Sequence, residues 1–291
     1  MLVRAWRHPV SRADFFGAVA RHVVDTVLSR VVSGPVVFPF ANDTWLFCAR
    51  RGRDAAELRL LVLKDFEAMS FVAHYLRPGD HFVDVGAGIG SYAVLAAGVG
   101  GAHVTAFEPS DAEAIALHRN VGLNALERSI NCLTVGLGDV SGPGRIVIEP
   151  GLARRVVVDP CADRAFAVSV RRLDDQLSGN KRPRLIKIAA SGDELRVLRG
   201  AHATLEQPGL EAVIVATEKL PRGTSARWHC VCALLEKHEF VPAGYDPFQR
   251  RLLRGGASGR KGLFVRKPNV GAITRRLESA PHFWAGSALC L

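Results

Sequence analysis

The sequence predicts an α/β protein built on a doubly wound, mostly parallel sheet, with helices on both faces and an antiparallel C-terminal edge. From residue 81 onward, short Val- and Ile-rich strands alternate with helical patterns, which is typical of a parallel sheet. A glycine-rich loop joins the first of these strands to a helix. Residues 240–267 contain strand-like runs without helices between them, as expected for an antiparallel edge.

Composition fits one large globular domain or two small ones. The chain has 291 residues, of which 48% are hydrophobic, so it can bury a sizeable core. Its longest apolar runs are of strand length, and we expect no membrane span. Residues 15–28 are apolar but are interrupted by Arg21, His22 and Asp25, which favours an amphipathic helix over a signal peptide. We therefore expect a cytoplasmic protein.

The cysteines and the charge give only general indications. The six cysteines form no C-x-x-C pair and have no neighbouring His at metal-ligand spacing, so we interpret them as structural thiols and expect no metal. The net charge of +10 favours anionic partners. Its densest patch, residues 250–267, is more simply explained as a solvated hairpin edge. We expect no nucleic-acid partner.

The N-terminal segment differs from the alternating pattern that follows it. Residues 36–40 and 44–49 flank Asn42-Asp43 and predict a hairpin. Residues 58–64 are expected to add another strand. We predict an appendage of one helix and this hairpin over residues 1–66, a main domain over 67–270 and a C-terminal tail over 271–291.

Four strand-to-helix units follow in the main domain. The strands are expected at 81–85, 103–107, 185–189 and 212–217. Helices are expected from residue 91, after residue 110, from residue 193 and around residue 228. The third helix should present Leu195, Leu198 and Leu205 on one face.

The segment FVDVGAGIGSY, residues 82–92, carries the strongest chemical signal. A strand runs into Gly86, Gly88 and Gly90, and a helix begins at once. Glycine lets the backbone turn sharply and approach a ligand closely. A dinucleotide fingerprint would need a glycine where Ser91 stands, and a P-loop would need Gly-Lys-Ser/Thr. The G-x-G-x-G spacing therefore predicts a loop for a different nucleotide-like cofactor.

Two carboxylates accompany this loop. Asp84 precedes the glycines, and Glu108 follows the next strand in HVTAFEPS. A carboxylate at that second strand end can accept hydrogen bonds from both hydroxyls of a ribose. The pair strengthens the cofactor interpretation over that of a simple tight turn.

With these residues the chain resembles the FkbM family of S-adenosylmethionine-dependent methyltransferases. The resemblance covers residues 66–267 and depends on the order of six segments: FVDVGAGIGSY, VTAFEPS, HRNVGLNAL, VGLGDVSG, VRRLDDQL and LIKIAASGDELRVLRGAHATL. It implies a Rossmann-like class I methyltransferase fold, S-adenosylmethionine as methyl donor, and an oxygen acceptor that is often a sugar hydroxyl of a glycan or natural product.

The resemblance also implies roles for individual residues. Gly86, Gly88 and Gly90 would contact the donor, Asp84 would orient its amino-acid part, and Glu108 would bind its ribose. Asp139 would lie near the adenine. Glu67, in the helix before the glycine strand, would be a further donor-site residue.

The chain departs from the family at one strand end. The family usually has Lys-x-Asp-x-Glu-Gly there, whereas this chain has LIKIAASG, with Ala189 and Ser191 in place of the two carboxylates. The ends of strands in a doubly wound sheet line the ligand crevice, so both losses fall in the expected acceptor region. The catalytic candidates that remain nearby are Lys187, Glu218 and Ser191, with Asp193 and His229 as further replacements. Lys187 is expected to orient the substrate or to pair with Glu218, because a lysine inside an apolar strand needs a partner.

Three classes of function follow from these observations. The first is an O-methyltransferase that acts on a hydroxyl of a glycan or small natural product. The second is a catalytically degenerate S-adenosylmethionine-binding protein that acts as a subunit or regulator. A nucleic-acid methyltransferase ranks third, because only the charge suggests it. The acceptor and the oligomeric state, a homodimer included, are left open by the sequence.

Overall fold

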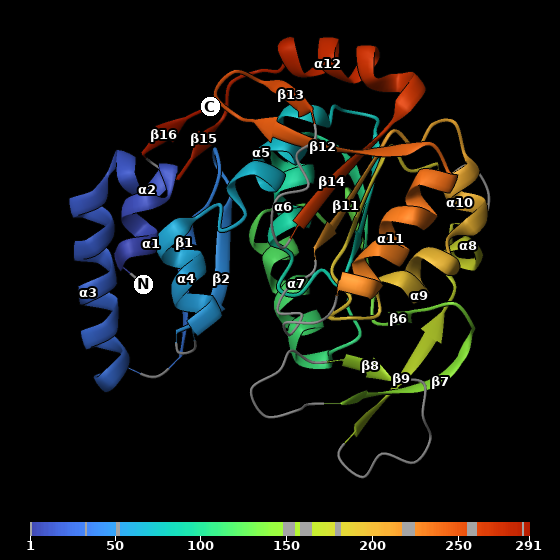
Figure 1. The fold of residues 1–291 in the computed structure, drawn as a ribbon. Coiled ribbons are helices and arrows are strands. Elements are labelled where there is room, and N and C mark those ends of the chain that lie inside the picture. The colour runs from blue at the N-terminus through green and yellow to red at the C-terminus, as the bar shows by residue number, and fades with distance from the viewer. Residues whose placement is uncertain are drawn as a thin grey trace.

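A computed structural model describes residues 2–32, 34–50, 53–147, 155–157, 165–177, 182–216, 225–254, 261–286 and 288–291. Its centre is a sheet of eight strands in the order β13-β12-β14-β11-β10-β3-β4-β5 (Figure 1). The parallel strands are β3 (His81–Val85), β4 (His103–Phe107), β5 (Ile130–Leu133), β10 (Leu185–Ile188) and β11 (Ala212–Ala216). Antiparallel pairs add β12 (Phe240–Asp246), β13 (Arg251–Arg254) and β14 (Lys261–Arg266). The predicted fold class is confirmed.

Both faces of the sheet are buried, which explains why its parallel strands consist of continuous apolar runs. Successive strand residues point to opposite faces, so Phe82 joins one hydrophobic cluster and Val83 joins the other. The first cluster includes residues of α5 (Phe66–Tyr75), α6 (Ser91–Gly98) and α7 (Asp111–Leu123), among other helices. Those of the second are α8 (Leu173–Gln176), α9 (Glu194–Arg199), α10 (His202–Glu206) and α11 (Ser225–Lys237).

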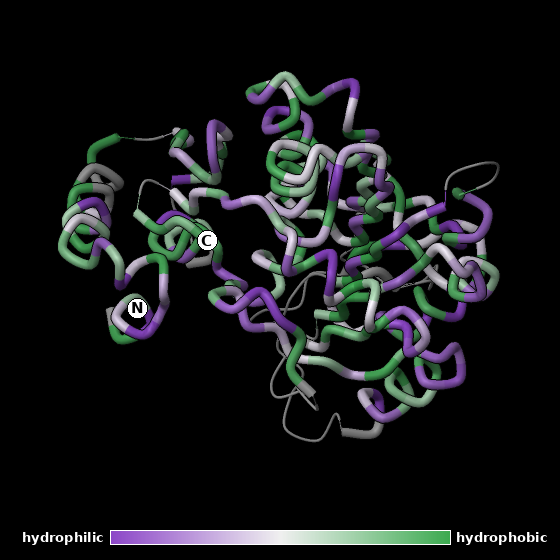
Figure 2. Tube along the Cα trace, turned by 90° about the horizontal axis from the view of Figure 1, so that it is seen from above, coloured by the Kyte–Doolittle hydropathy of each residue, from purple (hydrophilic) through white to green (hydrophobic). Residues whose placement is uncertain are grey.

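The N-terminal segment forms helices and a hairpin beside the sheet. The elements are α1 (Leu2–Arg7), α2 (Pro9–Ala13), α3 (Phe15–Val31), β1 (Pro35–Pro39), β2 (Trp45–Ala49) and α4 (Arg53–Leu61). Figure 2, seen from above, shows these helices to one side of the sheet, next to the C-terminal end of the chain. The hairpin is held to α7 by Asn120, which accepts a hydrogen bond from Phe47 N at 2.6 Å and donates to Ile89 O at 2.7 Å. The same side chain thus connects the hairpin to the glycine loop.

Two predicted elements are corrected by the structure. The strand expected at 58–64 is wrong, because residues 53–61 form α4, in which Ala, Glu, Leu and Arg favour a helix and Leu60 and Leu61 pack against Ala5 and Ala18. The single helix expected after residue 193 is divided into α9 and α10. The break falls at Gly200, where a Cβ atom would lie 1.9 Å from Gly138 O, so a close backbone contact interrupts the helix.

A second sheet was not expected from the sequence. Its strands, in the order β6-β9-β7-β8, are β6 (Gly136–Leu137), β7 (Gly142–Val147), β8 (Arg155–Val157) and β9 (Ala165–Arg171). It projects from the main body between β5 and β10 in the chain (Figure 1). The two residues of β6, the three of β8 and the Gly-Pro-Gly start of β7 gave little periodicity by which to predict the sheet, although β9, AFAVSVR, has the alternation of a strand.

The C-terminal residues fold back onto the sheet. The segment contains a 3₁₀ turn η1 (Lys267–Asn269), α12 (Val270–Glu278) and the short pair β15 (Trp284–Ala285) and β16 (Leu289–Cys290). Arg276 donates to Tyr75 O at 2.7 Å and forms an ion pair with Asp80. Asp80 also pairs with Arg184 at 2.7 Å, and Arg184 pairs with Glu211. This network fixes the amino-terminal ends of the parallel strands.

No helix within the described residues is long and apolar enough to cross a membrane.

Candidate active site

The glycine loop follows β3 and has the backbone conformation that the sequence predicts. Gly86, Gly88 and Gly90 have φ angles of +68°, +57° and +89°. A Cβ atom would lie 2.1 Å from Ala189 O at Gly86 and 2.4 Å from the Leu117 side chain at Gly90, whereas at Gly88 it would meet nothing within 4 Å. Packing therefore requires glycine at the first and third positions. The middle position leaves room for a ligand to approach the backbone.

Glu108 stands at the end of β4, directly beside the loop. Its carboxylate is 5% exposed and accepts hydrogen bonds from Gly88 N at 2.8 Å and Ser110 N at 2.9 Å. Burial, and after it the charge of Glu113, raises the pKa of Glu108 to about 7. A carboxylate with two oxygens has further lone pairs, so Glu108 can still accept hydrogen bonds from ligand hydroxyls.

Asp84 and Lys187 form a buried ion pair beneath the loop. Their positions are paired in the parallel ladder of β3 and β10, and Lys187 Nζ lies 2.9 Å from Asp84 Oδ1. The Asp84 side chain is fully buried and that of Lys187 is 6% exposed. Lys187 also donates to Gly86 O at 2.8 Å and lies over the Tyr92 ring, 5.2 Å from its centroid.

Lys187 therefore connects the Asp84 carboxylate to the backbone of the glycine loop. The expected alternative partner, Glu218, lies outside the described residues. The direct contact of Asp84 with the donor stays a prediction, because its carboxylate is fully buried in this structure.

The turn after β10 has Ala189 and Ser191 at the positions where the family resemblance implies carboxylates. Ala189 N donates to Val85 O at 3.0 Å, while Ser191 and Gly192 have positive φ angles of 51° and 107°. Gly192 N donates to the Glu194 carboxylate at 3.0 Å. Burial raises the pKa of Glu194 above its usual range. The sequence analysis did not identify Glu194 as a site residue. Its position three residues after Ser191, at the start of the expected helix, was the available signal.

A pocket of ≈ 170 Å³ opens beside this turn, between α9 and the start of α11. Its lining combines one aromatic side chain with several charged ones: Asp193, Glu194, Arg196, Arg227 and Trp228. Polar groups around an apolar surface are typical of small-molecule sites. The structure thus has a small pocket with both apolar and charged lining residues next to the strand end that lacks the two carboxylates.

The other predicted donor-site residues lie in different environments. Asp139 accepts a hydrogen bond from Arg196 Nε at 2.9 Å, which connects the loop after β6 to the pocket lining. Glu67 is exposed in the first turn of α5. Two residues earlier, Asp65 accepts a hydrogen bond from Tyr92 at 3.2 Å. The roles of Asp139 and Glu67 in donor binding stay predictions.

The residues at the strand ends fit S-adenosylmethionine. Gly88 leaves the space that a close ligand needs. Glu108, at the end of the next strand, has carboxylate lone pairs left for ligand hydroxyls. A doubly wound sheet with a glycine-rich loop after β3 and the Glu108 carboxylate after β4 has the arrangement of a nucleotide-type cofactor site.

The comparison of sequences identifies the family. Residues 84–242 match the FkbM methyltransferase domain. The chain therefore belongs to the FkbM family and is an S-adenosylmethionine-dependent methyltransferase. No protein of curated function matches it in sequence.

Several solved structures have distantly similar folds. The precorrin-6y C5,15-methyltransferase of Geobacter metallireducens is 11% identical, with 69% of this chain and 86% of that chain covered and a TM-score of 0.41. An rRNA methylase from Streptococcus thermophilus is 13% identical, with 68% and 91% covered and a TM-score of 0.39. A Streptococcus mutans protein described as a methyltransferase, in complex with SAH, is 10% identical, with 68% and 93% covered and a TM-score of 0.41.

The buried ion pair gives a first prediction. Lys187→Met should lower the free energy of unfolding by about 3 to 5 kcal/mol, because it leaves the Asp84 charge buried without a counter-charge. The double variant Asp84→Asn/Lys187→Met should recover part of that loss, since it removes both charges. Urea denaturation measures all three proteins. A loss below about 1 kcal/mol in the single variant would contradict the described pairing.

The glycines of the loop give a second prediction through a matched pair of variants. Gly86→Ala should cost about 2 to 5 kcal/mol of stability, because it combines a left-handed φ with a backbone clash. Gly88→Ala should cost only about 1 to 2 kcal/mol but weaken donor binding about tenfold or more, or about 1.4 kcal/mol. Thermal unfolding and calorimetric titration with S-adenosylmethionine separate the two effects. Equal donor affinity in Gly88→Ala and wild type would show that no ligand approaches this position.

Glu108 gives a third prediction, for pH dependence. Its carboxylate is ionised above its pKa of about 7 and accepts hydrogen bonds most strongly in that form. Donor affinity should therefore fall about tenfold between pH 8 and pH 6. Glu108→Gln should bind more weakly at pH 8 and lack this part of the pH dependence, so the difference between the two proteins isolates the carboxylate. Parallel pH profiles would exclude it from the donor site.

Proposed function

We propose that this protein transfers a methyl group to a hydroxyl of a glycan or small natural product. The observation that carries the proposal is the pocket of ≈ 170 Å³ beside the turn after β10. Its exposed Arg227 and half-buried Trp228 offer a hydrogen-bond donor and an aromatic surface. This combination suits a small polyhydroxylated acceptor, which has both hydroxyl groups and apolar C–H faces.

Methyl transfer requires mainly that the acceptor hydroxyl be aligned with the methyl group of the donor. S-adenosylmethionine, when bound, supplies a methyl group that is already electrophilic. The glycine loop and Glu108 would hold the donor, and the pocket would hold the hydroxyl in line with it. A general base adds roughly 10²- to 10⁴-fold. We propose Glu194 for that task, because it lines the pocket and its pKa is raised by burial.

The other catalytic candidates keep smaller roles in this proposal. Lys187 positions the glycine loop through Gly86 O and Asp84. Ser191 shapes the turn, with its φ of 51°. Glu218 is proposed from the sequence alone as a second carboxylate of the acceptor region.

A second candidate function is a donor-binding protein without catalysis, acting as a subunit or regulator. The observation that favours it is the presence of Ala189 and Ser191 where the family resemblance implies two carboxylates. This protein would bind the donor as tightly as an enzyme does.

The fourth prediction separates these functions in one series of experiments. Calorimetric titration with S-adenosylmethionine should give saturable binding that Glu108→Ala abolishes. Transfer of labelled methyl groups to a panel of monosaccharides, oligosaccharides and polyols should then depend on Glu194. Glu194→Gln should reduce kcat by about 10²-fold or more with little change in donor affinity. The matched control is Glu236→Gln, on the exposed side of α11.

Each outcome selects one interpretation. Donor binding together with Glu194-dependent transfer supports the methyltransferase proposal. Donor binding without transfer to any acceptor favours the regulatory protein. Transfer that is unchanged in Glu194→Gln removes this residue as the base, and absence of donor binding by the folded protein overturns both functions.

A further inference from the structure

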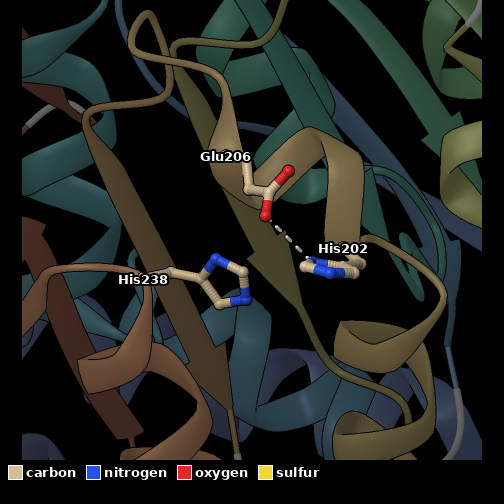
Figure 3. A group of neighbouring side chains, drawn as sticks. All are labelled: His202, Glu206 and His238. Atoms are coloured by element: carbon tan, nitrogen blue, oxygen red, sulfur yellow. Dashed lines mark ion pairs between the residues drawn. The ribbon is translucent and has the colours of Figure 1, made fainter.

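A cluster of two histidines and a glutamate lies away from the donor site. His202 and Glu206 begin and end α10, and His238 follows the last residue of α11. Figure 3 shows the three side chains facing one another across the gap between the two helices. One ligand atom from each lies within 4.8 Å of the others. His202 Nδ1 and Glu206 Oε1 are 3.6 Å apart.

These side chains have the chemistry of a metal site. Two imidazoles and one carboxylate are ligands that zinc and similar divalent metals bind, usually with water in the fourth position. Zinc-to-nitrogen distances of about 2.0 Å in a tetrahedron separate two ligands by about 3.4 Å. His202 and Glu206 are already close to that separation, and both are exposed. A small rotation of the exposed side chains would bring all three within range.

The backbone that carries the ligands is fixed by one buried arginine. Arg266, 6% exposed, donates from its Nη2 to Leu205 O at 2.6 Å and Gln207 O at 3.1 Å, on either side of Glu206. Its Nη1 donates to His238 O at 3.1 Å. The ends of α10 and α11 are therefore held together independently of any ion. Only side-chain rotations remain to be ordered when a metal binds, which lowers the entropic cost.

We propose that His202, Glu206 and His238 bind one divalent transition-metal ion of the zinc type, with solvent as the remaining ligand. The ion would fasten the end of α10 to the end of α11. The chain continues from α10 into β11 and from α11 into β12. The proposed site therefore lies at the amino ends of these strands, whereas the glycine loop follows the carboxyl end of β3. The site would therefore support the sheet and would take no part in methyl transfer. This site was not predicted from the sequence, because His238 is distant in the chain from the other two ligands.

The fifth prediction tests this site with cobalt(II) as a spectroscopic probe. The full-length protein, first treated with a chelator and kept reduced, is titrated with Co²⁺ and followed by visible absorption. We expect one equivalent to bind with d–d bands and without the strong near-ultraviolet band of a cobalt–thiolate bond. That band would instead indicate the exposed Cys230 or Cys290 as ligands and would contradict the proposal.

Variants complete the test. His202→Ala and His238→Ala should each weaken Co²⁺ binding by at least about 100-fold, and Glu206→Gln by about tenfold or more. His118→Ala, exposed on α7, should bind as the wild type does. Zn²⁺ should raise the melting temperature of the wild type but leave that of His202→Ala/His238→Ala unchanged.

Donor binding provides the control for folding. The double variant should bind S-adenosylmethionine with wild-type affinity, because its substitutions lie at the amino ends of the strands, away from the glycine loop. Unchanged Co²⁺ binding in this variant, or no one-to-one binding by the wild type, would overturn the metal site. Neither result would bear on the proposed methyl transfer, which is measured separately.

Discussion

The ion pair between Lys187 and Asp84 is the constraint on which the site depends. Two opposite charges lie in the middle of an apolar sheet, where an unpaired charge would be costly. Their register in neighbouring strands brings them together, and the ammonium also holds the carbonyl of Gly86. Ala189, which directly follows β10, brings its backbone oxygen so close to the loop that only glycine fits at position 86. The conformation of the loop is thus set from beneath by β10, before any ligand binds.

The carboxyl and amino ends of the parallel strands have different roles. At the carboxyl ends of the strands lie the glycine loop, Glu108 and the pocket lined by Trp228. The amino ends are fixed by charged networks, in which Asp80 holds Arg184 and Arg276. Part of the basic patch at residues 250–267 serves the same purpose, because Arg266 is buried and bonded to backbone carbonyls. These cations contribute to the fold, so the positive net charge alone says little about a partner.

The turn after β10 has a well-defined backbone conformation but few reactive side chains. Its backbone has positive φ angles at residues 191 and 192, and it lacks the two carboxylates that the family resemblance implies. Two buried carboxylates, those of Asp193 and Glu194, follow this turn, and Glu194 accepts the hydrogen bond of Gly192 N. A turn whose shape is set by its own backbone can lose its reactive groups without losing the fold. The donor half of the site and the acceptor half can therefore change independently.

The sequence by itself determined the parallel sheet, the hairpin at 36–49, the glycine loop, Glu108 and the family, because apolar periodicity and the need for glycine are local properties. It could not separate helix from strand at 58–61, where a short apolar run fits both. Only the tertiary structure decided that Lys187 pairs with Asp84, that Glu194 lines a pocket and that His238 meets His202 and Glu206. These contacts join segments that are far apart in the chain, and they exist only where strand order and helix packing bring the segments together.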